Sequence, residues 1–371
     1  MAAYTTIDNP ELYFQCDTYT GNGNNNHAQT FEGDENMQPD MVWIKGRNVA
    51  ENHHIFDSVR GANKRILANT TGAEFDDASN LQSFDSDGYT LGTADGINKN
   101  TSLFVAWAWK AGTSFTNDAS STSVGNTDSN GSASSTAGFS IAKWEGAGAS
   151  LDIQVKHGLS VKPAVMLVKN IEEAGGNSWA VYHHKNTSAP ETDYLKLDAN
   201  TATTDQAEVW HDTEPTSAVF TAGDFSGSNR SGDDFVGYFW NEIQGFSKFG
   251  SYTGNGNADG PFIHLGFQPA VVFTKRTDSS GNWNVFDNRR TGATKGGTLG
   301  KANPMEQLLH PDLSNAEVNV SDGGHTIDGL ATGFKIRSSS AISNTDGGTY
   351  IYMAFAAAPL TNSNGVPCNA M

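Results

Sequence analysis

The stretch Pro39-Asp-Met-Val-Trp-Ile-Lys45 gives the first indication of the fold, because close counterparts of it occur twice more. They read Pro163-Ala-Val-Met-Leu-Val-Lys169 and Pro269-Ala-Val-Val-Phe-Thr-Lys275, and proline precedes lysine by six positions in all three. Proline is tolerated at the first position of a strand, where its missing N–H does least harm. The near-continuous apolar run that follows indicates a strand that is buried on both faces or central in its sheet.

Three further landmarks recur in the same order around this strand, which indicates an internal repeat. An aromatic-Gly-x-Gly corner precedes it, as Tyr19-Thr-Gly-Asn-Gly23, Trp144-Glu-Gly-Ala-Gly148 and Tyr252-Thr-Gly-Asn-Gly256. A shorter strand follows it, as His53-His-Ile-Phe56, Trp179-Ala-Val-Tyr182 and Trp283-Asn-Val-Phe286. A closing strand ends each unit, as Phe104-Val-Ala-Trp-Ala-Trp109, Phe235-Val-Gly-Tyr-Phe-Trp240 and Tyr350-Ile-Tyr-Met-Ala-Phe355. Large and small side chains alternate in these closing strands, the period of a packed β-strand.

The landmarks predict an all-β protein of three tandem antiparallel β-sandwich repeats, jelly-roll-like and with little helix. The predicted boundaries are repeat 1 (1–112), a Ser/Thr/Asn/Gly-rich linker (113–137), repeat 2 (138–243), repeat 3 (244–359) and a C-terminal tail (360–371). The linker predicts a separable repeat 1, whereas repeats 2 and 3 should form a rigid pair. The best helix candidate is Pro304-Met-Glu-Gln-Leu-Leu-His310, which starts with proline.

Composition narrows the classes of partner and compartment. The formal net charge of −18 argues against nucleic acid, and anionic membrane surfaces are disfavoured for the same reason. Met1-Ala-Ala-Tyr-Thr-Thr-Ile-Asp8 carries neither a basic region nor an apolar run, so we expect no secretory signal. Cys16 and Cys368 lie too far apart in sequence to suggest a disulfide framework, and free thiols made in a reducing cytoplasm are expected.

Searching the sequence for chemistry gives no catalytic, cofactor-binding or metal-ligating residues to assign, and the ligand-binding residues stay unknown. A Gly-x-Ser-x-Gly elbow and a Walker loop are both missing, and no helix pattern follows the Gly-x-Gly corners. The doublets His53-His54 and His183-His184 suggest a metal, but they do not align between repeats. We therefore read them as strand and loop histidines and predict a protein that is not an enzyme.

Acidic turns leave calcium open as the one cofactor to consider, although no stretch matches an EF-hand loop. These turns are Asp76-Asp77, Asp85-Ser-Asp-Gly88, Asp233-Asp234 and Ser321-Asp-Gly-Gly324. A further polar element, Asp-x-x-Arg, occurs as Asp57/Arg60 and Asp287/Arg290, whereas repeat 2 carries His183 and Asn186 in its place. Such an element either forms an ion pair that holds a turn or makes a polar contact to a neighbouring subunit.

The order of these motifs resembles a repeat of tail fibre-like or uncharacterised structural proteins from marine and cyanobacterial tailed phages. The motifs that carry the resemblance are Tyr-Thr-Gly-Asn-Gly, the Pro-led strand ending in Lys, Trp-x-Val followed by an apolar residue, and the closing strand. The resemblance implies a virion structural protein, such as a tail fibre, a knob or a capsid decoration protein, made in the host cytoplasm. Its expected partners are other virion proteins and a host-surface glycan or receptor, with a homo-oligomer also compatible.

Two other functions remain open from the sequence. A carbohydrate-binding lectin or adhesin would use the Asn-, Gly- and aromatic-rich loops for sugar contact. A polysaccharide depolymerase would need two carboxylates facing each other across a sugar, which sequence alone cannot show. Because the shared residues describe the scaffold, any function should lie in loops that differ between repeats.

Overall fold

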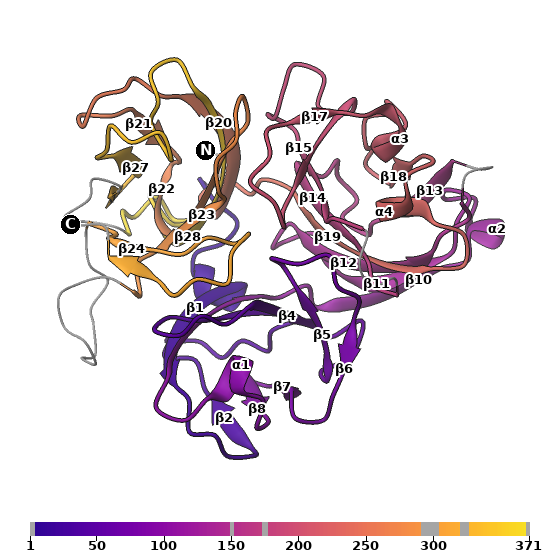
Figure 1. The fold of residues 1–371 in the computed structure, drawn as a ribbon, viewed down its shortest axis with the longest axis horizontal. Coiled ribbons are helices and arrows are strands. Elements are labelled where there is room, and N and C mark those ends of the chain that lie inside the picture. The colour runs from indigo at the N-terminus through magenta and orange to yellow at the C-terminus, as the bar shows by residue number, and fades with distance from the viewer. Residues whose placement is uncertain (1–3, 149–151, 173–176, 291–303, 320–325, 369–371) are drawn as a thin grey trace.

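The computed structural model describes residues 4–148, 152–172, 177–290, 304–319 and 326–368, and it confirms an all-β fold. Figure 1 shows three lobes around a common centre, one for each predicted repeat. In repeat 1 the principal sheet contains, in spatial order, β1 (Phe14–Thr20), β9 (Leu103–Trp109), β3 (Met41–Gly46), β4 (His53–Asp57), β5 (Lys64–Leu67) and β6 (Phe75–Asp76). In repeat 3 it contains β20 (Ser247–Thr253), β28 (Thr349–Pro359), β22 (Phe267–Arg276) and β23 (Asn284–Asp287).

Repeat 2 has the same strand order in a wider sheet. It runs β10 (Thr113–Asn117), β11 (Ser129–Ser134), β12 (Phe139–Glu145), β19 (Asp234–Trp240), β14 (Val165–Asn170), β15 (Ala180–His183), β16 (Asp193–Lys196) and β17 (Thr204–Asp205). In each lobe the closing strand therefore lies between the corner strand and the Pro-led strand, and all these pairs are antiparallel. This correspondence supports the predicted repeat.

Smaller sheets pack against the principal ones and complete a sandwich in each lobe. They are β2 (His27–Gln29), β8 (Gly88–Leu91) and β7 (Leu81–Asp85) in repeat 1, β13 (Ile153–Lys156) and β18 (Val219–Ala222) in repeat 2, and β21 (Phe262–His264), β27 (Gly333–Ile336) and β26 (Ile327–Leu330) in repeat 3. A two-stranded sheet of β24 (Gln307–Leu308) and β25 (Val318–Asn319) lies beside β23 instead, through the antiparallel bridge between Leu309 and Val285. The helical segments described are η1 (Pro10–Leu12), α1 (Asp95–Asn98), α2 (Ala119–Thr122), α3 (Ala207–Trp210) and α4 (Ser226–Asn229). Among the described residues, no helix is long and apolar enough to cross a bilayer.

The Pro-led strands are buried on both faces, as the sequence predicts. Every residue of β3 and of β14 is buried. Successive side chains of a strand point to opposite sides. Met41 and Trp43 accordingly enter a core shared by all three repeats, while Val42 and Ile44 enter the sandwich interior of repeat 1. The two faces of each principal sheet thus pack differently. One face packs inside the sandwich of its own repeat, and the other packs against the neighbouring repeats.

Six aromatic rings meet at the centre of the shared core, and we call them the aromatic hub: Phe14, Trp109, Phe139, Trp240, Phe246 and Phe355. The Trp109 ring lies 6.0 Å from that of Trp240 and 5.5 Å from that of Phe355, centroid to centroid. Phe139 stacks on Trp240 at 5.0 Å. Because the hub and its surrounding core draw side chains from all three repeats, the expectation of a separable repeat 1 is wrong.

The predicted linker is also wrong, because residues 113–137 form structure. They contain β10, α2 and β11, and the hairpin of β10 and β11 extends the sheet of repeat 2 through pairing with β12. The Asp118 side chain caps α2 by accepting the N–H of Ser121. A Cβ at Gly131 would lie 2.8 Å from the Phe115 ring, so this glycine lets the ring cover β11. Ser- and Thr-rich composition misled the prediction because an outer hairpin needs backbone partners more than apolar side chains.

The helix expected at 304–310 is absent, and that segment is extended. Gln307 and Leu308 form β24, Met305 bridges to Ile327, and Leu309 bridges to Val285. The apolar spacing of Met305, Leu308 and Leu309 suits a helix, but neighbouring strands offer backbone partners that an isolated short helix would lack. Within the C-terminal tail, the Ser363 hydroxyl donates to Asp8 at 2.7 Å, so the tail contacts the N-terminal segment.

A buried asparagine fixes each Gly corner, and the sequence reading missed it. Asn98, Asn229 and Asn344 are at most 1 % exposed, and each precedes its closing-strand landmark by six residues. Their side-chain oxygens accept backbone N–H groups of the corner loops, from Asn22, Ala147 and Asn255 respectively. The second glycine of each corner, Gly23, Gly148 or Gly256, has a φ of 69°, 80° or 64° respectively, in the region that favours glycine.

Candidate functional site

A buried lysine at the end of each Pro-led strand reaches into a neighbouring repeat. Lys169 of repeat 2 donates from Nζ to the Thr71 carbonyl of repeat 1 at 3.1 Å. Lys275 of repeat 3 donates to Thr201 of repeat 2 at 2.8 Å, and Lys45 of repeat 1 donates to Ser314 of repeat 3 at 3.3 Å. The three bonds run in one direction around the centre, so the repeats form a closed ring. We refer to the three contacts as the 1–2, 2–3 and 3–1 interfaces.

Backbone hydrogen bonds follow the same cycle. The carbonyl two residues beyond each lysine accepts an N–H from the adjoining repeat: Ile171 from Glu74 at 2.8 Å, Thr277 from Thr203 at 2.9 Å, and Arg47 from Glu317 at 2.7 Å. Burial lowers the pKa of Lys45 and of Lys275 to about 8, because an ammonium group loses its hydration there. The recurring lysine therefore serves as an interface donor, a role that its fixed position in the landmark could have suggested.

Both Asp-x-x-Arg elements lie at interfaces between repeats, and each forms the expected ion pair at a turn. At the 1–2 interface, Arg60 pairs with Asp57, whose Oδ2 also accepts the Tyr238 hydroxyl of repeat 2 at 2.6 Å. Asp57 Oδ1 accepts the Arg60 backbone N–H at 2.9 Å, which holds the turn. The element thus stabilises a turn and contacts a neighbour, but the neighbour is the next repeat of the same chain.

The 3–1 interface repeats this arrangement with different aromatic chemistry. Arg290 Nε donates to Asp287 Oδ2 at 2.6 Å, and Trp107 Nε1 of repeat 1 donates to the same oxygen at 3.2 Å. The Arg290 guanidinium also lies 5.6 Å from the Trp107 ring centre, a cation–π contact. Both members of the ion pair have fully buried side chains, so each depends on the other for its compensation.

The 2–3 interface closes without an ion pair at the corresponding position. His183 Nε2 lies 3.1 Å from the Tyr352 carbonyl of repeat 3, and His184 Nε2 lies 2.8 Å from that of Phe249. A carbonyl oxygen can only accept, so Nε2 carries the hydrogen in both rings. Thr203 donates to Asn186 at 2.7 Å, where the other repeats place a glutamate against the arginine.

The other doublet, His53-His54, divides between two environments. His53 Nδ1 accepts the Trp43 indole N–H at 3.0 Å near the 3–1 interface, whereas His54 is buried and stacks with Phe56 inside repeat 1. Trp179 and Trp283 take the position of His53 in the other repeats, and their indoles donate across interfaces to Leu67 and Lys196. The two histidine doublets therefore make different kinds of contact. Among the described residues, no group of three His, Cys, Asp or Glu could hold a metal ion.

Two of the acidic turns proposed for calcium have carboxylates that accept hydrogen bonds from protein groups. Asp85 accepts the hydroxyls of Ser83 and Thr90, and Asp233 accepts the Asn170 amide. Ser321-Asp-Gly-Gly324 lies outside the described residues. Calcium therefore stays a prediction from composition.

A surface hollow with a volume of about 310 Å³ lies on repeat 2. It is lined by Thr116, Asn117, Asp118, Asp128, Ser129, Asn130, Lys143, Trp144, Glu145 and Asp234. Lys143 pairs with Asp234 at 2.6 Å. Much of the lining comes from the β10–β11 hairpin, and the sheets described for repeats 1 and 3 begin at β1 and β20 without one. This polar hollow is a feature in which the repeats differ.

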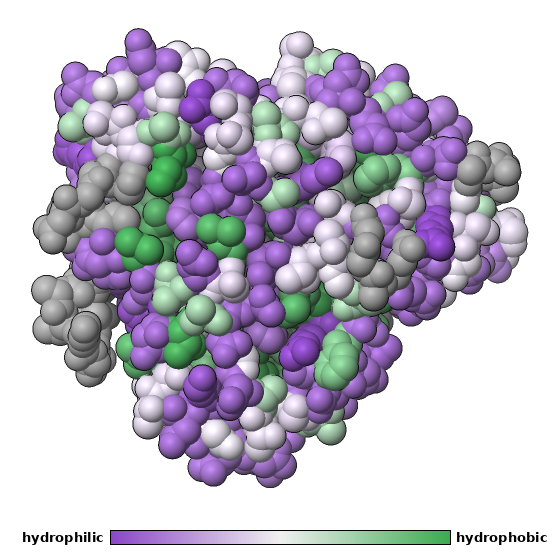
Figure 2. Space-filling view, in the orientation of Figure 1, coloured by the Kyte–Doolittle hydropathy of each residue, from purple (hydrophilic) through white to green (hydrophobic). Residues whose placement is uncertain are grey.

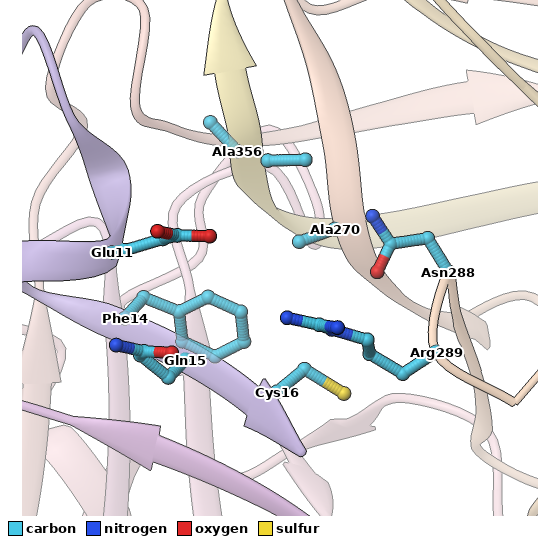
Figure 3. A pocket seen from close by; sticks show the side chains of 9 residues that line it. Glu11, Phe14, Gln15, Cys16, Ala270, Asn288, Arg289 and Ala356 are labelled. Atoms are coloured by element: carbon cyan, nitrogen blue, oxygen red, sulfur yellow. The ribbon is translucent and has the colours of Figure 1, made fainter. Parts of the chain in front are cut away.

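A second cavity, of about 20 Å³, lies at the 3–1 interface and has room for about one water. Figure 3 shows Arg289 of repeat 3 extending across it toward Phe14, with the Cys16 sulfur nearby. Burial raises the pKa of the Cys16 thiol, which makes the thiolate scarce. Cys16 is buried and Cys368 is exposed, and both are free thiols.

On the face shown in Figure 2, hydrophilic residues dominate and the hydrophobic ones form separate spots.

A family model described as a domain of unknown function (DUF7483) matches residues 9–359. No curated protein and no solved structure matches the chain.

Proposed function

This chain belongs to the DUF7483 family, whose function is unknown, and we propose that it is a non-enzymatic structural component of a tailed-phage virion. In this proposal the chain is a fibre, knob or decoration protein that contributes to host-surface attachment. The observation that carries this proposal is that the buried polar side chains make contacts between repeats of the same chain. The lysines, the Asp–Arg pairs and the His183–His184 pair all bind neighbouring repeats, so the groups that enzymes use for catalysis here hold a scaffold together.

The ring suits a particle component for physical reasons. Three repeats that share one core and fuse in one chain hold their relative positions without a concentration-dependent assembly step. The net charge of −18 opposes aggregation when many copies lie close together. The motif resemblance to phage structural repeats supports the same role.

Immuno-electron microscopy of purified particles tests this proposal. Antibody raised against the whole chain is expected to label intact particles at a repeated position on tail or capsid, and antibody absorbed with the pure protein provides the control. Particles that carry no label, together with the chain remaining in the unsedimented lysate, would overturn the proposal.

The polar hollow of repeat 2 supports a second candidate, a carbohydrate-binding lectin or adhesin. Hydroxyl, amide and carboxylate groups on an open sheet face can exchange hydrogen bonds with sugar hydroxyls, and its volume falls in the range of small-ligand sites. A glycan array is expected to show saccharide-competed binding that Asn130→Ala with Thr116→Ala reduces at least tenfold. Thr253→Ala, on an exposed position of β20, is the control and should leave binding unchanged. Equal binding by all variants, or none by the unaltered chain, would remove this candidate.

A further inference from the structure

The three interfaces of the ring differ in one respect that bears on their response to acid. Histidine makes contacts at both interfaces of repeat 3: His183 and His184 at the 2–3 interface, and His53 at the 3–1 interface. At the 1–2 interface, the described hydrogen bonds come instead from groups such as the Trp179 indole and the Tyr238 hydroxyl. An indole takes up no proton between neutral and mildly acidic pH, whereas an imidazole does. We propose that acidification releases repeat 3 from repeats 1 and 2 while the 1–2 interface stays closed.

The geometry of His183 leaves no place for a second proton. Its Nε2–H donates to Tyr352 across the interface, and its Nδ1 accepts the Lys185 backbone N–H at 3.1 Å. Protonation of Nδ1 removes that acceptor and charges a fully buried ring. The His183 and His184 rings lie 5.5 Å apart, so two such charges would repel.

The charged groups facing this pair add little compensation. Lys185 follows the doublet and Lys162 lies before β14, and both lower the pKa of His184. Glu242, between β19 and β20, acts in the opposite sense on His184. Glu242 already accepts the Phe249 N–H at 2.8 Å. The titratable neighbours of His183 are His184 and Lys185, and both lower its pKa because they disfavour a second positive charge.

His53 makes the 3–1 interface sensitive to acid as well. Its Nδ1 accepts the Trp43 indole N–H, and its ring stacks with Trp107 at 6.4 Å. Trp43 and Trp107 lie 5.6 and 5.9 Å from the Phe273 ring of repeat 3. A proton on Nδ1 therefore breaks the bond that orients Trp43 against repeat 3. Burial lowers the pKa of His53, and so do the neighbouring Lys45, His54 and Arg290, whereas a backbone hydrogen bond with His310 of repeat 3 raises it.

The direction of the pH effect follows from these contacts. Burial lowers the pKa of His183 to about 3, below the ordinary 6.5, so the closed interface excludes a proton that the open one binds. The stabilisation is complete above pH about 6.5 and is lost as pH falls toward 3. Burial raises the pKa of Asp17 to about 6 and of Asp312 to about 7, and these two carboxyls oppose the histidines.

Hydrogen exchange of the whole chain at pH 7.5, 6.0 and 5.0, corrected for intrinsic exchange, tests the proposal. Peptides covering β15, β23 and β28 should lose at least tenfold protection at pH 5.0, while peptides of the 1–2 interface around Glu74 and Ile171 keep theirs. Uniform loss at all three interfaces, or no loss at any, overturns the proposal using the unaltered protein alone.

A variant set isolates the histidines. His53→Trp installs the residue that the other repeats carry at this position, and His183→Gln with His184→Gln keeps a donor near Nε2 without a titrating ring. A triple variant that matches the unaltered chain at pH 7.5 is expected to keep its repeat 3 protection at pH 5.0. His211→Gln, at an exposed site, is the control and should behave as the unaltered chain. Acid loss of protection in such a matched triple variant would also contradict the proposal.

Discussion

Replacing Trp109 with alanine is expected to lower the free energy of unfolding by about 4 kcal/mol, the scale found for buried aromatic truncations. The Trp109 indole is 2 % exposed and lies at the centre of the aromatic hub. Its ring contacts Phe14 within repeat 1, Trp240 in repeat 2 and Phe355 in repeat 3, at 5.1, 6.0 and 5.5 Å. Removing it opens a cavity that all three repeats line, and no single repeat can close that cavity by moving alone.

Trp144 supplies a matched control for this prediction. It is also 2 % exposed, but its ring contacts Phe220 and Phe235, both inside the sandwich of repeat 2. Denaturant unfolding should show a similar total loss for Trp144→Ala. Hydrogen exchange should separate the two variants: Trp109→Ala weakens protection in β9, β19 and β28 together, whereas Trp144→Ala weakens it mainly in repeat 2. A Trp109→Ala effect confined to β9 would mean that the hub does not couple the repeats.

The strands that carry the aromatic hub could be predicted from the sequence, but the hub itself could not. Alternation of large and small residues predicts the closing strands, and the apolar run from Pro39 to Lys45 predicts burial on both faces, because both signals are local properties of one strand. Which partner covers the second face is a long-range property. Trp109 and Trp240 look alike whether they face a separate subunit or the same chain, so the ring could not be predicted from periodicity.

The wrong predictions share a related cause. Residues 113–137 have the composition of a linker, but Phe115, Asp118 and Gly131 hold a hairpin through a ring contact, a helix cap and backbone pairing, each a single-residue effect. Composition averages such effects away. The buried Asn98, Asn229 and Asn344 left a usable signal, a fixed spacing of six before each closing strand. Asparagine is common in the turns of this chain, and the spacing gains meaning only once the three corners are aligned.

Replacing Arg290 with methionine is expected to cost about 3–5 kcal/mol of unfolding free energy, the scale for breaking a buried pair from one side. The Asp287 carboxylate would keep the Trp107 indole and two backbone N–H groups as donors but lose its only counter-charge within the pair. Without Arg290, the Asp287 carboxylate would be a buried charge that lacks this counter-ion.

Denaturant unfolding of the double variant Asp287→Asn/Arg290→Met decides whether the charge itself matters. The side-chain oxygen of the introduced asparagine can still accept the turn N–H groups, so the double variant should recover about half of the loss. Arg337→Met removes a partner of Asp328 from a half-exposed site and should cost less than about 1 kcal/mol. Repeat 2 already closes its interface with His183 and Asn186 at this position. If the neutral pair restores stability at the 3–1 interface, ring closure depends on shape and hydrogen bonding. If it restores nothing, the two ion pairs are required at their interfaces, and repeat 2 relies on contacts of its own.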